Sequence, residues 1–327
     1  MPEWTFRSGT KYISRSKMSD PAYIIRNYGR EDFDKLVQLA VQVEKREQSC
    51  CGTSSQDLVE SLGRPNHFPE NNLFVAQKAE DIVGYLDVMP ELNIGRAVLS
   101  YLVHPEHMRK GFAKRLVECA IHRARELKVK VAHVNIPQDR EMVKRLFSRM
   151  GFRYVRRFLE LRLDLAEAHL RKINQIASPR RHLRRGEEDK LMEIQNRSFA
   201  NTWGYSPNTI EDIIYLTSLP NCSLEDMILS WDADKPVAYC WTKINPGEDK
   251  AIGGDKGRVY MLGVDPDYRG KEEGRQVLLA GLSHLKNKGI RIVELTVDSE
   301  NKAACALYRS AGFKVWTSSL WYEKVLA

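Results

Sequence analysis

The sequence predicts an α/β fold with mixed sheets, built from two tandem copies of one domain. Three observations support this prediction: the chain length, an internal repeat, and the order of helix and strand patterns in each copy. The chain has 327 residues, and at roughly 150 residues per domain this length indicates two domains. Hairpin-like strands come first in each copy and a strand–helix–strand pattern follows, which is typical of a sheet with antiparallel and parallel parts.

The repeat becomes visible when the sequence is shifted by 161 residues. The segment from Val103 to Phe152 then aligns without a gap with the segment from Val264 to Phe313. The apolar stripe of one helix and the β-branched pattern of the next strand recur at the same offset. Agreement in spacing over this length indicates two copies of one domain.

The elements expected in the two copies follow one order. Each copy opens with a strand and two helices, continues with a hairpin and a longer strand, and ends with a helix, a strand, a helix and a final strand. The expected helices are 31–47, 54–62, 112–127 and 140–150 in the first copy, and 187–199, 209–218, 274–287 and 301–310 in the second.

The domains are expected at 22–165 and 180–327, joined by a linker at 166–179. In the linker, Ala177-Ser178-Pro179 interrupts a helical pattern. Several arginines follow, but no aromatic residues are interleaved with them. We therefore interpret the segment as a solvated linker that leads into an edge strand rather than as an RNA-binding surface. Residues 1–21 match neither copy, and we expect them to form a disordered arm.

Composition and charge narrow the class of protein. Hydrophobic residues make up 43% and charged residues 29% of the chain, which excludes a disordered or membrane-embedded protein. A net charge of +8 is consistent with an anionic partner, such as nucleic acid, a membrane surface or a phosphorylated cofactor, and equally with a solvated basic surface that has no such partner. Six cysteines without a CxxC pair or zinc-ligand spacing indicate a reduced, cytoplasmic protein without a metal.

The most informative segment is the turn from strand to helix in each copy. The first turn reads VHPEHMRKGFAKRL (103–116) and the second VDPDYRGKEEGRQV (264–277). A basic, glycine-containing turn that opens a helix binds anions, because its free N–H groups and the helix N-terminus both favour negative charge. The pattern predicts a phosphate site in each copy.

These turns and the helix that follows resemble the GNAT superfamily of acyl-CoA-dependent N-acetyltransferases. Its motif is V-x-P-x-x-[QR]-x-x-G-x-[GA], followed by N-x-x-A-x-x-L-Y-x-x-x-G-F, and the resemblance covers nearly the whole chain. The second copy matches at Val264, Pro266, Arg269, Gly270, Gly274, Asn301, Ala304, Leu307, Tyr308, Gly312 and Phe313; the first matches at Val103, Pro105, Gly111, Ala113, Leu146, Gly151 and Phe152. The two-domain layout is similar to mycothiol-synthase-like members.

The resemblance implies that acetyl-CoA is the co-substrate, held between splayed parallel strands with its pyrophosphate on the turn. Backbone N–H groups of the strand would polarise the thioester carbonyl. The implied cofactor residues of the second copy are Leu262, Gly263, Val264, Arg269, Gly270, Lys271, Gly274, Arg275 and Asn301. Those of the first copy are Leu102, Val103, Arg109, Lys110, Gly111, Phe112 and Ala113.

The two copies depart from the motif in complementary ways. The second copy has Glu272 where the turn expects glycine and Glu273 where it expects an apolar residue. Both carboxylates would weaken pyrophosphate binding unless their side chains point outward. The first copy keeps Gly111 beside two cations and therefore has the better phosphate turn by local charge.

Only the second copy has a tyrosine at the position where the family has its proton donor. Acetyl transfer needs a neutral amine to attack and a thiolate to leave, and a phenol with a pKa near 10 can protonate that thiolate. Tyr308 is therefore the expected general acid, whereas Phe147, its counterpart, cannot donate. The alternative role for Tyr308 is a ring packed on the sheet.

The general base and the acceptor stay open. Glu294, Glu225 and Asp226 are candidate bases, and each is also explained as a surface carboxylate. His104 and His107 form a weak metal pattern, and we expect a solvated pair instead. The resemblance places the acceptor pocket on the helix 187–199 and the loop after it, at Phe199, Trp203 and Tyr205.

Two functions from different classes follow. The first is an N-acetyltransferase acting on a primary amine of a small molecule or peptide, with the second copy catalytic. The alternative is a non-catalytic module in which the first copy holds acetyl-CoA. A third reading, an RNA-associated protein, is weaker, and the sequence does not determine the oligomeric state.

Overall fold

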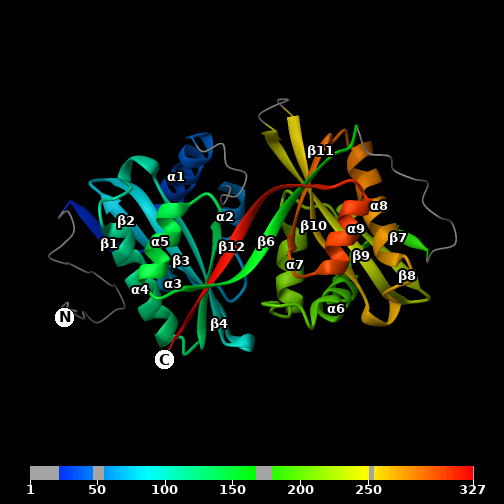
Figure 1. Ribbon diagram of the computed structural model, residues 1–327, viewed down its shortest axis with the longest axis horizontal. Helices are drawn as coiled ribbons and strands as arrows, with labels where there is room; N and C mark the ends of the chain where they lie inside the picture. Colours follow the sequence, from blue (N-terminus) through cyan, green and yellow to red (C-terminus); the bar gives the residue numbers. More distant parts are fainter. Residues whose placement is uncertain (1–21, 47–54, 167–178, 250–253, 327) are drawn as a thin grey trace. The chain divides into compact units, whose positions relative to one another are not determined.

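The computed structural model describes residues 22–46, 55–166, 179–249 and 254–326, shown in Figure 1. The expected arm at 1–21 and most of the linker lie outside these residues. The chain forms two compact units. Unit 1 comprises Met1–Arg156 and Ser319–Ala327, and unit 2 comprises Arg157–Ser318.

Unit 1 has a mixed sheet in the order β1-β2-β3-β4-β5-β12. Neighbouring strands are antiparallel except for β4 and β5, which are parallel. Its elements are β1 (Tyr23–Asn27), η1 (Arg30–Asp32), α1 (Phe33–Arg46), α2 (Ser55–Leu62), α3 (Pro69–Asn72), β2 (Leu73–Lys78), β3 (Asp81–Glu91), η2 (Leu92–Ile94), β4 (Arg96–Val103), η3 (Pro105–His107), α4 (Phe112–Glu126), β5 (Val131–Pro137), α5 (Glu141–Arg149) and the end of β12 (Lys314–Val325).

Unit 2 repeats this arrangement in the order β7-β8-β9-β10-β11-β6, with β10 and β11 parallel. Its elements are most of β6 (Arg153–Asp164), β7 (Arg180–His182), α6 (Glu188–Phe199), α7 (Ile210–Ser218), η4 (Leu224–Asp226), β8 (Met227–Asp232), β9 (Lys235–Asp249), β10 (Gly254–Val264), η5 (Pro266–Tyr268), α8 (Glu273–Asn287), β11 (Ile292–Asp298) and α9 (Lys302–Ser310). The mixed α/β sheet expected for each copy is confirmed.

The final strand of each repeat completes the sheet of the other unit. β6 pairs antiparallel with β11, and β12 pairs antiparallel with β5. Leu161 and Leu163 of β6 are buried in the core of unit 2 beside Leu295. The expected ranges 22–165 and 180–327 therefore assign each final strand to its own copy, whereas in the structure β6 closes the unit 2 sheet and β12 closes the unit 1 sheet. The two final strands have equivalent patterns, so the sequence alone does not distinguish the exchange.

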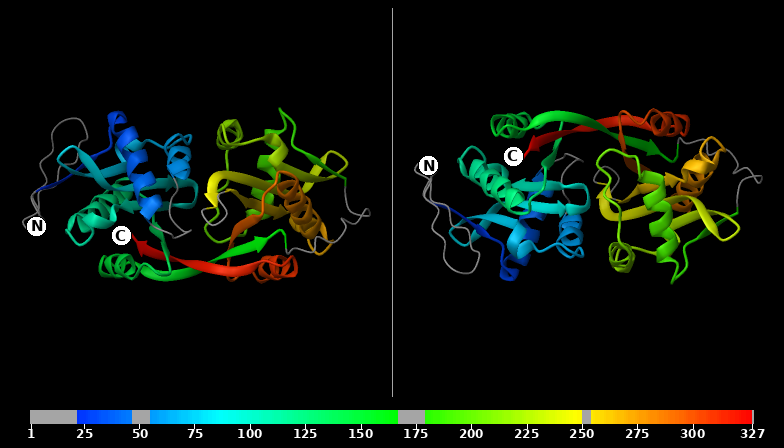
Figure 2. Two further views of the ribbon diagram at one scale, coloured as in Figure 1. Left: turned by 90° about the horizontal axis from the view of Figure 1, so that it is seen from above. Right: turned by 90° about the horizontal axis from the view of Figure 1, so that it is seen from below.

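Helices cover both faces of the unit 2 sheet, as the two views of Figure 2 show. Tyr239 and Cys240 are neighbours on β9 and point to opposite faces, because side chains alternate along a strand. Tyr239 packs in the core under α6 and α7, whereas Cys240 packs in the core under α8. A Cβ on Gly281 of α8 would lie 2.5 Å from the Cys240 sulfur, so this glycine lets the helix approach the sheet.

Local signals explain where the helices form. The buried positions of α1 are Leu36, Leu39, Ala40 and Val43, which is the spacing of one helical face. α7 begins after Thr209, whose hydroxyl accepts a hydrogen bond from the backbone N–H of Asp212 while the Asp212 carboxylate accepts one from the Thr209 backbone. This reciprocal cap satisfies two donors that the first turn leaves free.

Candidate active site

The two parallel strands at the centre of each unit separate before they end. In unit 2, β11 pairs with β10 at Gly257 and Arg258, while β10 stays paired with β9 as far as Val264. In unit 1, β5 pairs with β4 from Arg96 to Leu99, and β4 continues to Val103. The last residues of β10 and β4 thus have one edge that the parallel neighbour does not cover. An extended ligand can pair with such an edge as an additional strand.

The two splayed strands differ by an irregularity. The β10–β9 register shifts between Val259 and Met261, so one extra residue lies on β10 where the splay begins. The β4–β3 register runs residue for residue from Gly84 opposite Val103 to the start of β4. A bulge redirects a strand and its backbone groups. Among the described residues, only unit 2 therefore combines the splay with a bulge on its central strand.

The turn after each splayed strand has the same backbone shape in both units. Two positions in each turn have a left-handed φ: Arg109 (64°) and Gly111 (83°) in unit 1, Gly270 (78°) and Glu272 (64°) in unit 2. The positions correspond at the repeat offset. Each turn thus has glycine at one of them and a side chain that disfavours this conformation at the other. Glu272 preserves the shape of the turn despite replacing glycine.

The two acidic residues of the unit 2 turn lie in different surroundings. The Glu272 side chain is 73% exposed, and its carboxylate lies 4.0 Å from the Arg275 Nε atom. Glu273, the first residue of α8, is buried. The Glu272 carboxylate is thus solvated and close to a cation, which reduces its effect on a bound phosphate.

The cations expected to hold phosphate lie on the surface of the turns. Arg269 is exposed, and its Nη2 donates to the Ser198 carbonyl at 2.8 Å, at the end of α6. The Lys271 ammonium lies 4.7 Å from the centre of the Tyr268 ring. In unit 1, Lys110 is exposed, and the Arg109 Nε lies 3.2 Å from the Met142 sulfur.

A buried carboxylate with two partly exposed cations anchors the unit 2 turn, and sequence reasoning missed it. The Asp265 carboxylate accepts hydrogen bonds from the Arg197 guanidinium at 2.7 and 2.9 Å and lies 2.9 Å from the Lys235 ammonium. Arg197, assisted by Lys235, holds the Asp265 pKa well below its usual range. The corresponding residue of unit 1 is His104, which is not an acid, so the two copies share no sequence signal at this position.

Several predicted cofactor residues have structural roles for their side chains. Phe112 is 1% exposed and stacks on Tyr23 at 4.9 Å between ring centres. Asn301 caps α9, where its oxygen accepts from the Ala304 N–H at 3.1 Å. The remaining strand residues contribute packing side chains and leave their backbone to meet a ligand; they are Leu102, Val103, Leu262 and Val264. Ala113, in the first turn of α4, is half-buried.

Two glycines of unit 2 occupy positions that a side chain would obstruct. A Cβ on Gly263 would lie 2.6 Å from both the Ser198 Cβ and the Tyr239 ring. A Cβ on Gly274 would lie 3.1 Å from the Val264 side chain. These residues bring α6 and α8 close to the end of β10.

Tyr308 lies on α9 in the core of unit 2. It is 6% exposed and meets Phe313 edge to face, with 5.9 Å between ring centres. Burial raises its pKa above the usual value for a phenol, with nearby Cys240 and Cys305 adding to the effect. The hydroxyl therefore stays protonated. Phe147 occupies the corresponding position in unit 1 and is 1% exposed.

The carboxylates proposed as bases are engaged with basic groups. Glu294 lies 2.5 Å from the Arg162 guanidinium, and the exposed Glu225 lies 3.4 Å from the Lys288 ammonium. Asp226 is buried and lies 2.9 Å from the His284 Nε2.

The expectation of a solvated histidine pair is wrong. His104 is 8% exposed, and its Nδ1 accepts from the Glu106 N–H at 3.3 Å. The His107 Nδ1 lies 2.9 Å from the Tyr23 hydroxyl. The His104 ring is thus held within its own turn, and the His107 ring is held by the first residue of β1.

The aromatic residues expected at the acceptor pocket fix the loop after α6. Tyr205 stacks on Phe199 at 5.3 Å between ring centres, and its hydroxyl donates to the Asn196 side chain at 2.8 Å. Burial raises the pKa of Tyr205 to about 12. Trp203 meets Phe158 of β6 edge to face at 6.1 Å.

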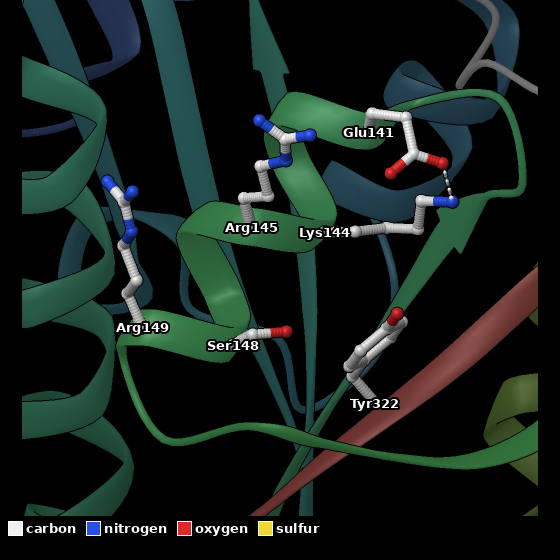
Figure 3. Close-up of a pocket in the computed structure, with 6 residues that line it drawn as sticks. All are labelled: Glu141, Lys144, Arg145, Ser148, Arg149 and Tyr322. Carbon is white, nitrogen blue, oxygen red and sulfur yellow. Dashed lines mark hydrogen bonds and ion pairs between the residues drawn. The ribbon is translucent and has the colours of Figure 1, made fainter.

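An open depression of about 370 Å³ lies on α5 in unit 1, and none of the residues that line it is a predicted site residue. Figure 3 shows Tyr322 facing α5 across it, while the Lys144 ammonium turns to Glu141 at 2.5 Å. Its lining is mainly charged: Glu141, Lys144, Arg145, Ser148, Arg149 and Tyr322.

A mixed sheet whose central parallel strands separate above a basic turn and a helix N-terminus defines an acyl-CoA-dependent acyltransferase. Residues 189–313 match the model of the acetyltransferase (GNAT) family, and residues 69–154 match that of an acetyltransferase (GNAT) domain. The mycothiol acetyltransferase of Stackebrandtia nassauensis is 30% identical over 261 residues, which cover 79% of this chain and 84% of the relative. That of Saccharomonospora viridis is 30% identical over 255 residues, covering 75% and 80%.

Solved structures show the same fold. A GCN5-related N-acetyltransferase from Sphaerobacter thermophilus aligns with a TM-score of 0.72 at 19% identity, covering 94% of this chain and 97% of the other. A tandem GNAT protein from the clavulanic acid biosynthesis pathway aligns with a TM-score of 0.67 at 15% identity, covering 93% and 98%. The chain therefore belongs to the GNAT acetyltransferase family, with two such domains in tandem, and is an acetyl-CoA-dependent N-acetyltransferase. None of the helices within the described residues has the length and apolar character to cross a membrane.

Proposed function

We propose that unit 2 transfers an acetyl group from acetyl-CoA to a primary amine of a small molecule or peptide, and that unit 1 does not catalyse this transfer. The observation that carries the proposal is that unit 2 combines the bulged, splayed strand β10 with a tyrosine at the donor position. Unit 1 has the splay without a bulge, and Phe147 without a hydroxyl.

Three groups of residues in unit 2 have separate roles in this proposal. The backbone N–H groups at the start of α8, with Arg269, Lys271 and Arg275, hold the pyrophosphate of acetyl-CoA. The free edge of β10 from Met261 to Val264 pairs with the pantetheine and polarises the thioester carbonyl. The amine nitrogen attacks the carbonyl carbon, the carbon–sulfur bond breaks, and Tyr308 donates its hydroxyl proton to the sulfur.

The acceptor is proposed from the relatives. The matched curated proteins are named mycothiol acetyltransferases, which supports a small-molecule amine related to mycothiol as the acceptor. The aromatic residues at the end of α6 suit the apolar part of such a molecule. The four cysteines of the described residues are free thiols, which supports a reducing, cytoplasmic location.

The alternative function is a non-catalytic acetyl-CoA-binding module. Glu272 and Glu273 in the unit 2 turn favour it, because carboxylates oppose a bound phosphate. The binding module predicts that acetyl-CoA binds but that no free CoA is released with any acceptor.

The experiment measures binding and turnover together. Acetyl-CoA at about 100 times its dissociation constant should stabilise the protein by roughly 2.7 kcal/mol. Free CoA thiol is then followed with glucosamine, S-methylcysteine and hydroxylamine as acceptors. Enzyme-dependent release with any of them supports the transferase; stabilisation with no release supports the binding module, and neither effect contradicts both.

A further inference from the structure

The face of the unit 2 sheet opposite α8 and α9 carries a line of charged and polar side chains across β6, β11 and β10. Leu161, Leu163 and Leu295 of these strands point into the core under α8 and α9. Because side chains alternate along a strand, the residues between them point to the other face. The residues on that face are Glu160, Arg162, Thr296, Glu294, Lys256 and Arg258.

Thr296 and Glu160 lie at the level where β10 and β11 have separated. β11 pairs with β10 at Val293 and Glu294, and Thr296 is two residues further along β11. Glu160 is directly opposite Thr296 on β6. Thr296 thus lies on a strand that borders the splay assigned to the acyl group by the proposed function, and Glu160 lies beside it on the next strand.

A short chain of hydrogen bonds joins the three strands at this point. The Arg258 Nη2 donates to the Thr296 hydroxyl at 2.9 Å, and the Thr296 hydroxyl donates to the Glu160 Oε2 at 2.6 Å. The hydroxyl has one proton, so accepting from Arg258 fixes it as the donor to Glu160.

The two carboxylates on this face differ in their partners. Glu294 faces two cations, Arg162 at 2.5 Å and Lys256 at 3.4 Å. Within the described residues, Glu160 makes one hydrogen bond, and its donor is an uncharged hydroxyl. A proton on Glu294 would break two ion pairs, whereas a proton on Glu160 breaks none.

On this basis, and resting on the proposed acetyl transfer in unit 2, we propose that Glu160 is the general base that accepts the proton of the attacking ammonium group, with Thr296 and Arg258 as its positioning residues. Glu160 lies on one face of the sheet next to the splay, and Tyr308 lies in the core on the other face. The amine thus approaches from the side of Glu160, and the thiolate leaves toward Tyr308.

The protons balance in this scheme. Glu160 takes one proton from the ammonium, and the neutral nitrogen forms the carbon–nitrogen bond. Tyr308 protonates the sulfur as the carbon–sulfur bond breaks, and the second nitrogen proton returns the tyrosine to its neutral form through solvent. Glu160 then releases its proton to solvent.

The surroundings of Glu160 suit a general base. Burial raises its pKa, the Thr296 hydrogen bond and the Arg258 charge lower it, and the nearby Glu294 charge raises it. A carboxylate with a raised pKa gains driving force for proton transfer.

The test compares Glu160→Gln with the wild type at about pH 6.5, where S-methylcysteine is an ammonium ion and hydroxylamine is mostly uncharged. Turnover of S-methylcysteine should fall about 10²–10⁴-fold, while turnover of hydroxylamine and the KM for acetyl-CoA change little. Thr296→Val removes the hydrogen bond that stabilises the charged Glu160 carboxylate, which raises the Glu160 pKa further. The acid limb of the kcat profile against pH should therefore move to higher pH. The matched control, Glu294→Gln, removes a charge on the same face that raises the Glu160 pKa, so it should move that limb to lower pH, opposite to the shift in Thr296→Val.

Equal losses with both acceptors, or an unchanged pH profile in Thr296→Val, would overturn the assignment. A carbon-detected NMR titration of the Glu160 carboxyl, identified by its loss in Glu160→Gln, needs no acceptor. If the Glu160 carboxyl has an ordinary glutamate pKa, its role as the base is overturned, whether or not the wild type acetylates any probe. If the wild type acetylates no probe, that failure contradicts only the proposed function.

Discussion

The unit 2 turn has a residue that works against both its backbone and its proposed ligand, and replacing it should improve both. Glu272 has a φ of 64°. A side chain in this region costs about 1–2 kcal/mol, and glycine removes that cost. Glycine also gains more freedom in the unfolded chain, which offsets about 0.5–1 kcal/mol. We therefore expect Glu272→Gly to raise the free energy of unfolding by about 0.5–1 kcal/mol.

This change converts into a small shift of the melting temperature. A unit of this size gains about 2–4 °C for each kcal/mol, so calorimetry should show a rise of about 1–4 °C. The effect on acetyl-CoA is limited by solvent, because the Glu272 side chain is 73% exposed. Removing one solvated charge near a phosphate is worth at most about 1 kcal/mol, or roughly fivefold in affinity at low salt.

A second variant separates the two effects. Glu272→Ala removes the carboxylate but keeps a Cβ in the left-handed conformation. It should match Glu272→Gly in acetyl-CoA affinity by titration calorimetry, without the gain in melting temperature. If Glu272→Gly is neutral in both measurements, neither backbone strain nor charge at this turn matters, and the reasoning is refuted.

Three further changes test the packing and the charges. Gly263→Ala would place a Cβ 2.6 Å from Ser198 and Tyr239, so denaturant unfolding should show a loss of about 1–3 kcal/mol, and no loss would mean that α6 moves freely. Asn301→Ala removes the cap of α9 and should cost about 1 kcal/mol without raising the KM for acetyl-CoA; a raised KM would instead support a direct cofactor contact. Burial raises the pKa of Asp87, which lies 2.9 Å from the His67 ring, to about 7. At Asp87 itself the folded form therefore binds more protons than the unfolded form between about pH 4 and 7, so the contribution of this carboxyl to stability falls as pH rises through this range. The stability of the wild type minus that of Asp87→Asn should fall over the same range, and a difference that rises with pH would contradict the sign.

The repeat and the elements were predictable because they depend on local patterns. The helix expected at 112–127 is α4 at Phe112–Glu126, and the helix expected at 209–218 is α7 at Ile210–Ser218. Apolar periodicity and caps act within a few residues, so the sequence contains them directly. The exchange of β6 and β12 depends on which of two equivalent strands reaches an edge, and no local pattern encodes that choice.

The candidate site was predictable where a motif marks it. Tyr308 and the turn follow from the motif, and the left-handed φ at Glu272 agrees with its place at a glycine position. Glu160 was missed because it lies in the last strand of the first repeat, and only the strand exchange brings it to the second unit. Asp265 was missed because its cations come from α6 and β9, far away in the sequence.

The most direct test of the central claim is the turnover of Tyr308→Phe with any amine that the wild type acetylates. The substitution keeps the ring that packs against Phe313 and removes only the hydroxyl, so the fold and acetyl-CoA affinity should persist. Release of CoA thiol should fall about 10²–10⁴-fold. Adding the matched change Phe147→Tyr in unit 1 to this variant should not restore the release of CoA thiol. Turnover of Tyr308→Phe at the wild-type rate would contradict the assignment of Tyr308 as the proton donor and leave unit 2 without its distinguishing chemistry.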